Sequence, residues 1–335
     1  MRFLLGLDQG MSKTHAVVAS PDGQVLGLGR SLGGSHSITG MDHAMEMVKL
    51  AVQDALQNAG LPNSTVFDAV AAGLSGCDFA CERVLLTEAL SQIIPCSRIR
   101  VMNDCLPALR AGTRATCAII VCGGTGLNCA TRDPQGNEFV FGYFVPDLAH
   151  AGSSIGREAI HAVFDAFSGI GVKTSMEADV LDLLGEPDVM SLLYTYNLKP
   201  YSVDQIAPIA RIVEKHALRG DSVANQILKT FAVHAAAVAT AAIKRLQDQT
   251  TPPELILSGS VFKCRAPILW ESFYTAINEG VQNLGLPNRI SISNAKMEPI
   301  LGTLVYVAED VGMDGGEIYD RLLAQAEGLD LLRKM

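Results

Sequence analysis

Two turns in this sequence combine glycine with hydroxyl side chains in a way that could hold phosphate. The first reads DQGMSKT at residues 8–14, and the second reads CGGTGLN at residues 122–128. Glycine has no Cβ, so backbone N–H groups can converge on an anion, while Ser and Thr hydroxyls and a Lys add donors and charge. Either turn alone is more typical of an ordinary hairpin. Because both occur at equivalent places in the two halves of the chain, together they favour a polyphosphate site.

Two further segments place polar residues where apolar runs end. VMNDCLPALRAGT puts Asn103 and Asp104 after a predicted strand, where α/β sheets expose functional groups into a crevice. Asp104 is a candidate general base, and the alternative is that it only caps the following helix, which has Pro107 near its first turn. PELILSGSVFKC places Ser-Gly-Ser at residues 258–260 between a strand and a helix. A flat ligand can approach the backbone there, although such turns often contain Gly for steric reasons alone.

The composition predicts a chain that folds throughout, as two domains. A length of 335 residues exceeds what one core usually serves, and 48% of the residues are hydrophobic while 18% are charged. The net charge of -9, without a Lys/Arg block, argues against nucleic acid and anionic membrane as partners.

Targeting signals and cysteine usage predict a cytoplasmic protein with no membrane partner. The apolar run before Asp8 is too short for a secretory signal, and the longest apolar helical run, residues 231–243, is shorter than the roughly 20 residues that span a bilayer. The eight cysteines form no CxxC pair. We interpret them as small apolar side chains in a reducing compartment.

The hydrophobic pattern predicts two lobes with the same order of elements. In the first lobe we expect strands at 3–7, 15–20, 24–30, 66–72 and 98–102, helices at 41–58 and 80–93, and a helical turn from Asp104. Asp22-Gly23 is a strong hairpin signal between the second and third strands. In the second lobe we expect strands at 116–122, 127–131, 138–143, 254–257 and 290–292, and helices from about 153, at 221–247, 267–282 and 299–308, with a helical insertion at about 170–218. The repeat indicates duplication and a cleft between the lobes.

Five segments, taken in order, resemble one known family: GLDQGMSKT, AAGLSG, VMNDCLPALRAGT, IIVCGGTGLNCATRDPQGN and LILSGSVFK. They resemble the BadF/BadG/BcrA/BcrD-type ATPases, most closely the N-acetylglucosamine kinase branch, over roughly residues 3–308. The resemblance implies an α/β fold of two ribonuclease H-like (actin-like ATPase) lobes of duplicated βββαβαβα topology around a central cleft. The expected domains are 1–114, 115–315 with the insertion at about 170–218, and a C-terminal helix at 316–335 that packs back on the first lobe.

The resemblance also implies an activity and roles for individual residues. It implies a kinase that transfers the γ-phosphate of ATP to a hydroxyl of a hexose or (N-acetyl)hexosamine, with Asp104 as general base and Asp8 holding Mg²⁺ through water. The ATP-binding residues it implies are Gly10, Ser12, Lys13, Thr14, Gly123, Gly124, Thr125, Gly126, Gly259, Ser260 and Lys263. Asn128 matches a residue that contacts the sugar. Asn103, from its place beside Asp104, and Ser35, His36, Ser75 and Asp147 complete the predicted substrate-binding set.

The segment expected to close over the sugar departs from the family pattern. The family normally reads GGWG followed by GDEGSGYWIG, whereas residues 141–160 here read FGYFVPDLAHAGSSIGREAI. Phe144 replaces the Trp and His150-Ala151 replaces the acidic pair, so a sugar-binding carboxylate is lost unless Asp147 substitutes. The family's Asn after the third strand is also replaced, in LGGSHSITG. Changing buried polar groups can change the acceptor, so we expect a hexosamine-type kinase with an altered preference.

Two other classes of function remain open at this point. One is an ATPase that activates a partner reductase or dehydratase through a shared iron-sulfur cluster, for which Cys122 and Cys129 could be proposed, although both fall in predicted core strands. The other is a non-catalytic sugar-sensing protein, which the altered segment favours and the retained Asp104 and phosphate turns disfavour. The expected partner is a small-molecule sugar. The oligomeric state stays open, and a homodimer is one expectation.

Overall fold

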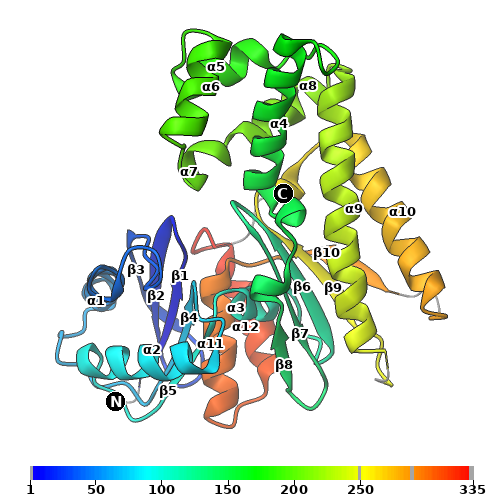
Figure 1. The fold of residues 1–335 in the computed structure, drawn as a ribbon. Coiled ribbons are helices and arrows are strands. Elements are labelled where there is room, and N and C mark those ends of the chain that lie inside the picture. Colours follow the sequence, from blue (N-terminus) through cyan, green and yellow to red (C-terminus); the bar gives the residue numbers. More distant parts are fainter. Residues whose placement is uncertain (1–2, 248–249, 287–289, 332–335) are drawn as a thin grey trace. The chain divides into compact units, whose positions relative to one another are not determined.

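The computed structural model describes residues 3–247, 250–286 and 290–331 and divides into two compact units (Figure 1). Unit 1 comprises the described residues up to 120, residues 130–140 and those from 292 onward, and unit 2 comprises residues 121–129 and the described residues of 141–291. The domain boundaries expected from the sequence stay a prediction.

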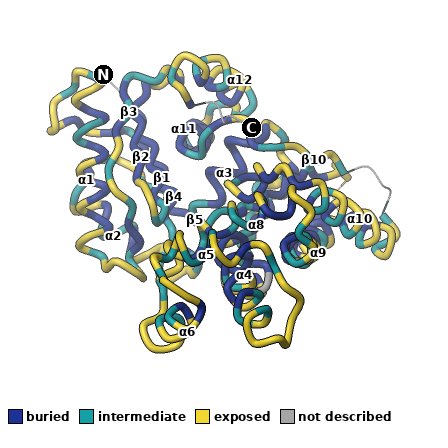
Figure 2. Tube along the Cα trace, turned by 90° about the horizontal axis from the view of Figure 1, so that it is seen from above, coloured by how far each residue is buried: buried dark blue, intermediate teal, exposed yellow. Residues whose placement is uncertain are grey.

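A five-stranded sheet forms the centre of unit 1. Its strands are β1 (Leu4–Gln9), β2 (Lys13–Ala19), β3 (Val25–Leu32), β4 (Ala69–Leu74) and β5 (Ile99–Asn103), in the order β3-β2-β1-β4-β5. The first three strands pair antiparallel, and β4 and β5 continue the sheet in parallel. Helix α1 (Met41–Asn58) connects β3 to β4, and α2 (Ala80–Ile93) connects β4 to β5. All residues of β1 and β4 are buried, as is usual for parallel strands covered on both faces (Figure 2).

Small residues allow α1 to lie close to this sheet. A Cβ added at Gly27 would lie 2.3 Å from the backbone oxygen of Ala55, and one at Gly29 would lie 2.0 Å from that of Ala51. Ala44, Ala51 and Ala55 are completely buried on the facing side of the helix. Larger side chains at these positions would push the helix away from the sheet.

Three further helices complete unit 1: α3 (Cys105–Gly112), α11 (Pro299–Asp310) and α12 (Gly315–Ala326). Gly302 of α11 packs on α3 so closely that a Cβ there would lie 1.9 Å from the backbone oxygen of Pro107. Helix α12 contacts the β2–β3 hairpin, because the Gln325 side chain accepts from the Val25 backbone N–H at 3.0 Å and donates to the Gly23 carbonyl at 3.2 Å. Residues 332–335 of the predicted C-terminal helix lie outside the described residues.

A second five-stranded sheet repeats the order of the first. Its strands are β6 (Ala118–Gly123), β7 (Leu127–Arg132), β8 (Glu138–Val140), β9 (Glu254–Ser258) and β10 (Ser291–Asn294), in the order β10-β9-β6-β7-β8. When β6, β7 and β8 are matched to β1, β2 and β3, the two sheets agree strand for strand. The predicted α/β fold with duplicated topology is confirmed. The strand predicted at 138–143 is shorter than expected, because residues 142–144 form a 3₁₀ turn.

Unit 2 is rich in helices. They are α4 (Ala151–Ser168), α5 (Glu177–Leu184), α6 (Val189–Leu198), α7 (Val203–Ile206), α8 (Ile209–Ala217), α9 (Ser222–Arg245) and α10 (Pro267–Asn283). Within the described part of the chain, α9 is the one helix whose length and composition would suit a membrane span. Its most apolar window is 56% buried, and the helix packs against α4, α8 and α10. We interpret α9 as the core helix of unit 2, in contrast to the largely exposed α6 (Figure 2).

Candidate functional site

The carboxyl ends of β1, β4 and β5 bring predicted site residues to one edge of the unit 1 sheet. Gln9 pairs in register with Leu74, and Leu74 with Asn103. Asp8 lies one position before Gln9, and Asp104 directly follows Asn103. Because parallel strands end at the same edge, these polar residues gather at the place where α/β sheets bind ligands.

The turn between β1 and β2 is the first glycine-containing loop. The Gly10 N–H donates to the Lys13 carbonyl at 3.0 Å, and the Gly34 N–H donates to the Gly10 carbonyl at 3.1 Å. A Cβ at Gly10 would meet no atom closer than 3.9 Å, so packing within the protein does not require glycine there. Ser12 is exposed, and the Lys13 ammonium lies 3.4 Å from the Glu298 carboxylate with a side chain that is 53% exposed. The loop therefore has room and free access for an anionic ligand.

Thr14 differs from its neighbours in this loop because it is completely buried. Its hydroxyl donates to the Leu32 carbonyl at 2.9 Å and accepts from the Gln9 side chain at 3.2 Å. The hydroxyl therefore links β1, β2 and β3. The assignment of Thr14 to ATP stays a prediction.

Asp104 occupies the N-cap position of α3, but its side chain makes no capping hydrogen bond. The Asn103 side chain performs that task instead and accepts from the Cys105 N–H at 3.0 Å. Burial and, after it, the negative charge of Asp78 raise the pKa of Asp104 from 3.8 to about 6. A carboxylate with such a pKa is ionised near neutral pH and still basic enough to accept a proton.

The sequence analysis missed two acidic residues near the end of β5, and one of them, Asp78, acts on Asp104. The Asp78 carboxylate accepts from the Asn103 side-chain amide at 2.9 Å, and its pKa is raised by burial and by Glu82. Glu82 in turn accepts from the backbone N–H groups of Asp78 and Phe79 at 2.8 and 2.9 Å. The signal that could have found Asp78 is its place in SGCD, directly after the β4 strand and its glycine turn.

The serine and histidine residues predicted after β3 join the same cluster. The Ser35 hydroxyl donates to the Ser75 carbonyl at 3.3 Å and lies 3.1 Å from the Ser37 hydroxyl. His36 Nε2 is 3.6 Å from the Glu82 carboxylate. His36 Nδ1 is buried and has no hydrogen-bond partner among the described residues. An unsatisfied buried nitrogen is costly, so it marks a position that a ligand group could fill.

The second glycine-containing loop joins β6 to β7 in unit 2. The N-terminal N–H groups of α4 hold it, because Gly152 donates to the Gly124 carbonyl and Ser153 donates to the Thr125 carbonyl, both at 2.9 Å. The Gly124 N–H also donates to the Gly126 carbonyl at 2.9 Å. A Cβ at Gly124 or Gly126 would meet nothing within 4 Å. These two glycines, like Gly10, leave open space next to an ordered backbone.

The predicted adenosine segment lies directly beside this loop in unit 2. Gly259 has φ +105°, and a Cβ there would lie 2.2 Å from the Gly123 carbonyl oxygen. A Cβ at Gly123 would lie 2.9 Å from the Phe262 ring. Both glycines are therefore required sterically where β6 and β9 end, which accounts for them without a ligand. Ser260 and Lys263 are exposed on the short 3₁₀ helix that follows.

Asn128 anchors the start of the altered segment in unit 2. Its side-chain oxygen accepts from the Cys129 N–H at 2.8 Å and from the Gly142 N–H at 2.9 Å. Phe144 in this segment is 77% exposed, and Asp147 is also exposed. The amide oxygen of Asn128 is thus used within the chain, and its contact with a sugar stays a prediction, as does that of Asp147.

The cysteines of β6 and β7 are enclosed by protein. Cys129 is buried and Cys122 is half-buried, and burial raises the pKa of the Cys129 thiol. Within the described residues, no group of three His, Cys, Asp or Glu side chains is placed to hold a metal ion.

Comparison with known proteins assigns the family. The sequence profile of the BadF/BadG/BcrA/BcrD ATPase family matches residues 5–307. The chain belongs to this family. One relative, the N-acetylmuramic acid/N-acetylglucosamine kinase of Clostridium acetobutylicum, is 26% identical over 91% of this chain and 98% of its own. As a member of an ATPase family, the protein uses ATP.

Solved structures with lower identity share the fold of this BadF/BadG/BcrA/BcrD family member. A candidate N-acetylglucosamine kinase from Chromobacterium violaceum has a TM-score of 0.71 at 23% identity and covers 92% of this chain and 99% of its own. A ROK family glucokinase from Streptomyces griseus, in complex with glucose and AMPPNP, has a TM-score of 0.58 at 17% identity and covers 92% and 98%. These likenesses confirm the predicted α/β fold.

Proposed function

We propose that this protein is an ATP-dependent sugar kinase that transfers the γ-phosphate of ATP to a hydroxyl of a hexosamine, with Asp104 as the general base. Asp104 carries the proposal, because its carboxylate lies at the end of β5, makes no capping hydrogen bond and has a pKa raised to about 6. The name of the Clostridium acetobutylicum relative supports the same reaction class.

The chemistry requires little more from a base than orientation and late proton acceptance. Phosphoryl transfer depends mainly on in-line positioning and on neutralising charge on the phosphates. Asp104 would orient the acceptor hydroxyl and take its proton as the oxygen–phosphorus bond forms. Asn103 acts as a positioning residue, because one side of its amide holds the α3 N-terminus and the other holds Asp78.

The residues present fit ATP and Mg²⁺. The three glycines Gly10, Gly124 and Gly126 leave open space beside the backbone of their loops, where phosphate oxygens could approach. Lys13 would add a positive charge, and the buried Asp8 carboxylate would hold Mg²⁺ through water. ATP supplies the phosphoryl group, and Mg²⁺ neutralises the charge that develops on it. The remaining proposed ATP-binding residues, in unit 2, are Thr125, Gly123, Gly259, Ser260 and Lys263.

The proposed acceptor is a neutral or amino sugar of the hexosamine type. We propose a cytoplasmic protein without nucleic-acid or membrane partners. Ser35, His36, Ser75 and Asn103 form the polar cluster beside Asp104, with Asp78 and Glu82 adding two acceptors. Asn128 and Asp147 remain proposed contacts from unit 2. Because residues 141–154 lack the family's acidic pair, we expect a preference that differs from strict N-acetylglucosamine recognition.

A coupled ADP-release screen over hexoses, hexosamines, N-acetylhexosamines and muropeptide sugars tests the proposal. At least one sugar should stimulate ADP release with wild-type protein, and Asp104→Asn should lose this stimulation while it still binds ATP. Slow ATP hydrolysis that no sugar stimulates would instead favour a sugar-sensing role. If N-acetylglucosamine were the best substrate by more than about tenfold, a margin worth about 1.4 kcal/mol, the altered-preference argument would be wrong.

A further inference from the structure

Helix α6 of unit 2 presents apolar side chains to solvent along one of its sides. Four residues, Met190, Leu193, Tyr194 and Leu198, are between 37% and 65% exposed. Spacings of three and four residues place side chains on the same side of a helix, so these four form one continuous α6 stripe. Figure 2 shows the exposed character of this helix.

A different side of α6 attaches the helix to the rest of unit 2. Val189 and Leu192 are buried, and the Tyr196 hydroxyl lies 3.1 Å from Nε2 of His161 on α4. The Tyr196 ring also packs edge-on against the Phe164 ring, with 5.7 Å between the ring centroids. The helix is therefore held in place within unit 2, and its α6 stripe stays on the surface.

The composition of α6 does not suit an exposed helix. Among the α-helices in the described residues, α6 alone contains no Asp, Glu, Lys, Arg or His. Helices without a charged face are normally buried, and exposed apolar surface often marks an interaction site. Helix α2 also exposes apolar side chains, Val84 and Leu85, but it carries Glu82, Arg83 and Glu88 as well. The α6 stripe is therefore the stronger candidate for a protein interface.

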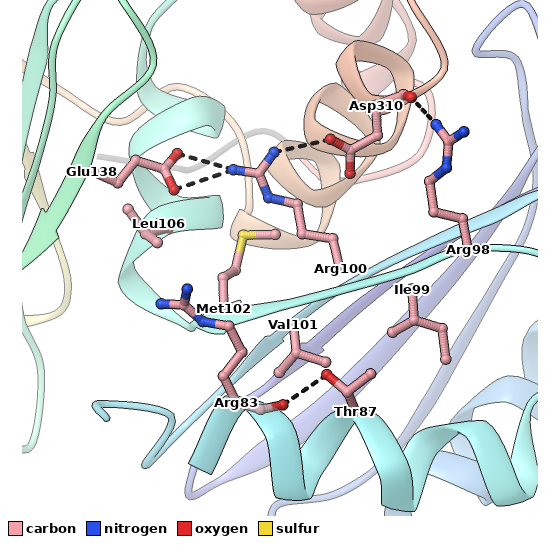
Figure 3. A pocket seen from close by; sticks show the side chains of 10 residues that line it. All are labelled: Arg83, Thr87, Arg98, Ile99, Arg100, Val101, Met102, Leu106, Glu138 and Asp310. Atoms are coloured by element: carbon pink, nitrogen blue, oxygen red, sulfur yellow. Dashed lines mark hydrogen bonds and ion pairs between the residues drawn. The ribbon is translucent and has the colours of Figure 1, made fainter. Parts of the chain in front are cut away.

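The charged pocket of unit 1 differs from the α6 stripe because its side chains already have partners. The pocket has a volume of about 360 Å³, and its lining includes Arg83, Arg98, Arg100, Glu138 and Asp310 (Figure 3). Arg100 lies 3.2 Å from Glu138 and 3.0 Å from Asp310. Arg98 donates to the backbone carbonyl of Asp310. These contacts satisfy the charged groups within the chain, whereas the α6 stripe is left open to solvent.

The two ends of α6 carry opposite charges. Asp188 is the N-cap residue and Lys199 is the C-cap residue, and both are exposed. Leu193 and Tyr194 lie midway between them in the sequence. If two copies of α6 pack antiparallel about a two-fold axis, Asp188 of each copy faces Lys199 of the other. A parallel arrangement would instead bring like charges together.

We propose that α6 forms the interface of a symmetric homodimer, in which the α6 stripes of two copies pack antiparallel. A second copy suits this surface because both its apolar side chains and its terminal charges are complementary to themselves. The helix has 10 residues and is about 15 Å long, so the contact is smaller than a standard interface of about 1,600 Å². The dimer should therefore be weak and reversible, with a Kd on the order of 10 µM. This assembly does not depend on the proposed kinase function.

Sedimentation velocity of the whole protein from about 1 to about 100 µM tests the proposal. The wild-type protein should shift from monomer to dimer as its concentration rises. Tyr194→Lys should raise the Kd at least about tenfold, because a charge would be buried at the interface close to its symmetry copy. Val84→Lys adds the same charge at an exposed apolar position of α2 and should leave the Kd unchanged. Tyr194 is 57% exposed, so the thermal unfolding of its variant should match that of the wild type.

Lys199→Glu tests the antiparallel arrangement. This variant should dimerise more weakly, because the new carboxylate would face Asp188 of the other copy. Adding Asp188→Asn should recover part of the affinity, since it removes the repulsion and keeps a side chain that can cap α6. A wild-type protein that stays monomeric at about 100 µM, or a dimer that survives Tyr194→Lys, would overturn the proposal. An unchanged Kd in Lys199→Glu would overturn the antiparallel pairing.

Discussion

Replacing Asp104 by asparagine should stabilise the protein while it removes sugar-dependent turnover. Asparagine keeps the shape of the side chain and removes its charge, so the fold should persist. The loss of a general base lowers kcat by about 10² to 10⁴, and ATP binding should stay mostly intact. A residue kept for structure would show the opposite behaviour, because its replacement would cost stability and leave the activity of the folded fraction unchanged.

The size of the stability gain follows from the pKa of Asp104. Burial and then the charge of Asp78 raise this pKa from 3.8 to about 6. A carboxyl with a raised folded-state pKa destabilises the folded protein once it is ionised, so stability falls as pH rises from 3.8 to about 6. At about 1.4 kcal/mol per pKa unit, the cost above that window reaches at most about 3 kcal/mol. Asp104 keeps intermediate solvent exposure, which sets this figure as an upper limit.

Thermal unfolding of wild type and Asp104→Asn at several pH values provides the measurement. With an unfolding entropy of about 2.1 cal/mol/K per residue, 3 kcal/mol corresponds to a rise in Tm of about 4 °C at neutral pH. The difference should shrink as pH falls through the window between 6 and 3.8. Asp320→Asn, which removes an exposed carboxylate paired with Arg114, is the control and should change stability by less than about 1 kcal/mol. A Tm difference that does not depend on pH would refute the reasoning.

Four further variants test the two glycine loops, the turn at Gly259 and the effect of Asp78 on Asp104. Lys13→Ala should raise the KM for ATP about tenfold without changing Tm, because its exposed ion pair contributes little; unchanged ATP kinetics would remove the first loop from the site. Asp78→Asn should move the acidic limb of the kcat/KM profile to lower pH, since a negative charge that raises the pKa of Asp104 is lost; an unshifted limb would contradict this coupling. Gly124→Ala should keep the wild-type Tm and weaken ATP binding. Gly259→Ala, at φ +105°, should lose about 1–3 kcal/mol of stability in chemical unfolding. Equal losses of stability in the two variants would argue against the assigned roles.

The order of the elements could be predicted because the signals for it are local. Runs of apolar residues with glycine turns between them mark β1 to β3, and the same pattern recurs at β6 to β8. Element ends were less accurate: the predicted strand at 138–143 ends at Val140, because the Asn128 side chain binds the Gly142 N–H and turns the chain. That contact joins residues far apart in sequence, so no local pattern could signal it.

The site shows the same division between local and distant information. The glycine turns and Asn103-Asp104 were visible as polar residues at strand ends. The loop sequence did not show that the Thr14 hydroxyl is buried against the Leu32 carbonyl. That contact forms only when β3 pairs with β2, and β3 is a separate segment of the chain.

The sequence by itself determined the α/β class and the duplicated element order, because apolar runs and turn chemistry act over a few residues. The family followed from the resemblance of five segments to a known family. Only the tertiary structure placed Asp78 beside Asp104 and gathered the arginines of α2 and β5 with Glu138 at one pocket. The physical reason is that the pKa of a group depends on how deeply the group is buried and on its distance from other charged groups. Parallel strand pairing and helix packing set those distances between residues that the chain separates widely.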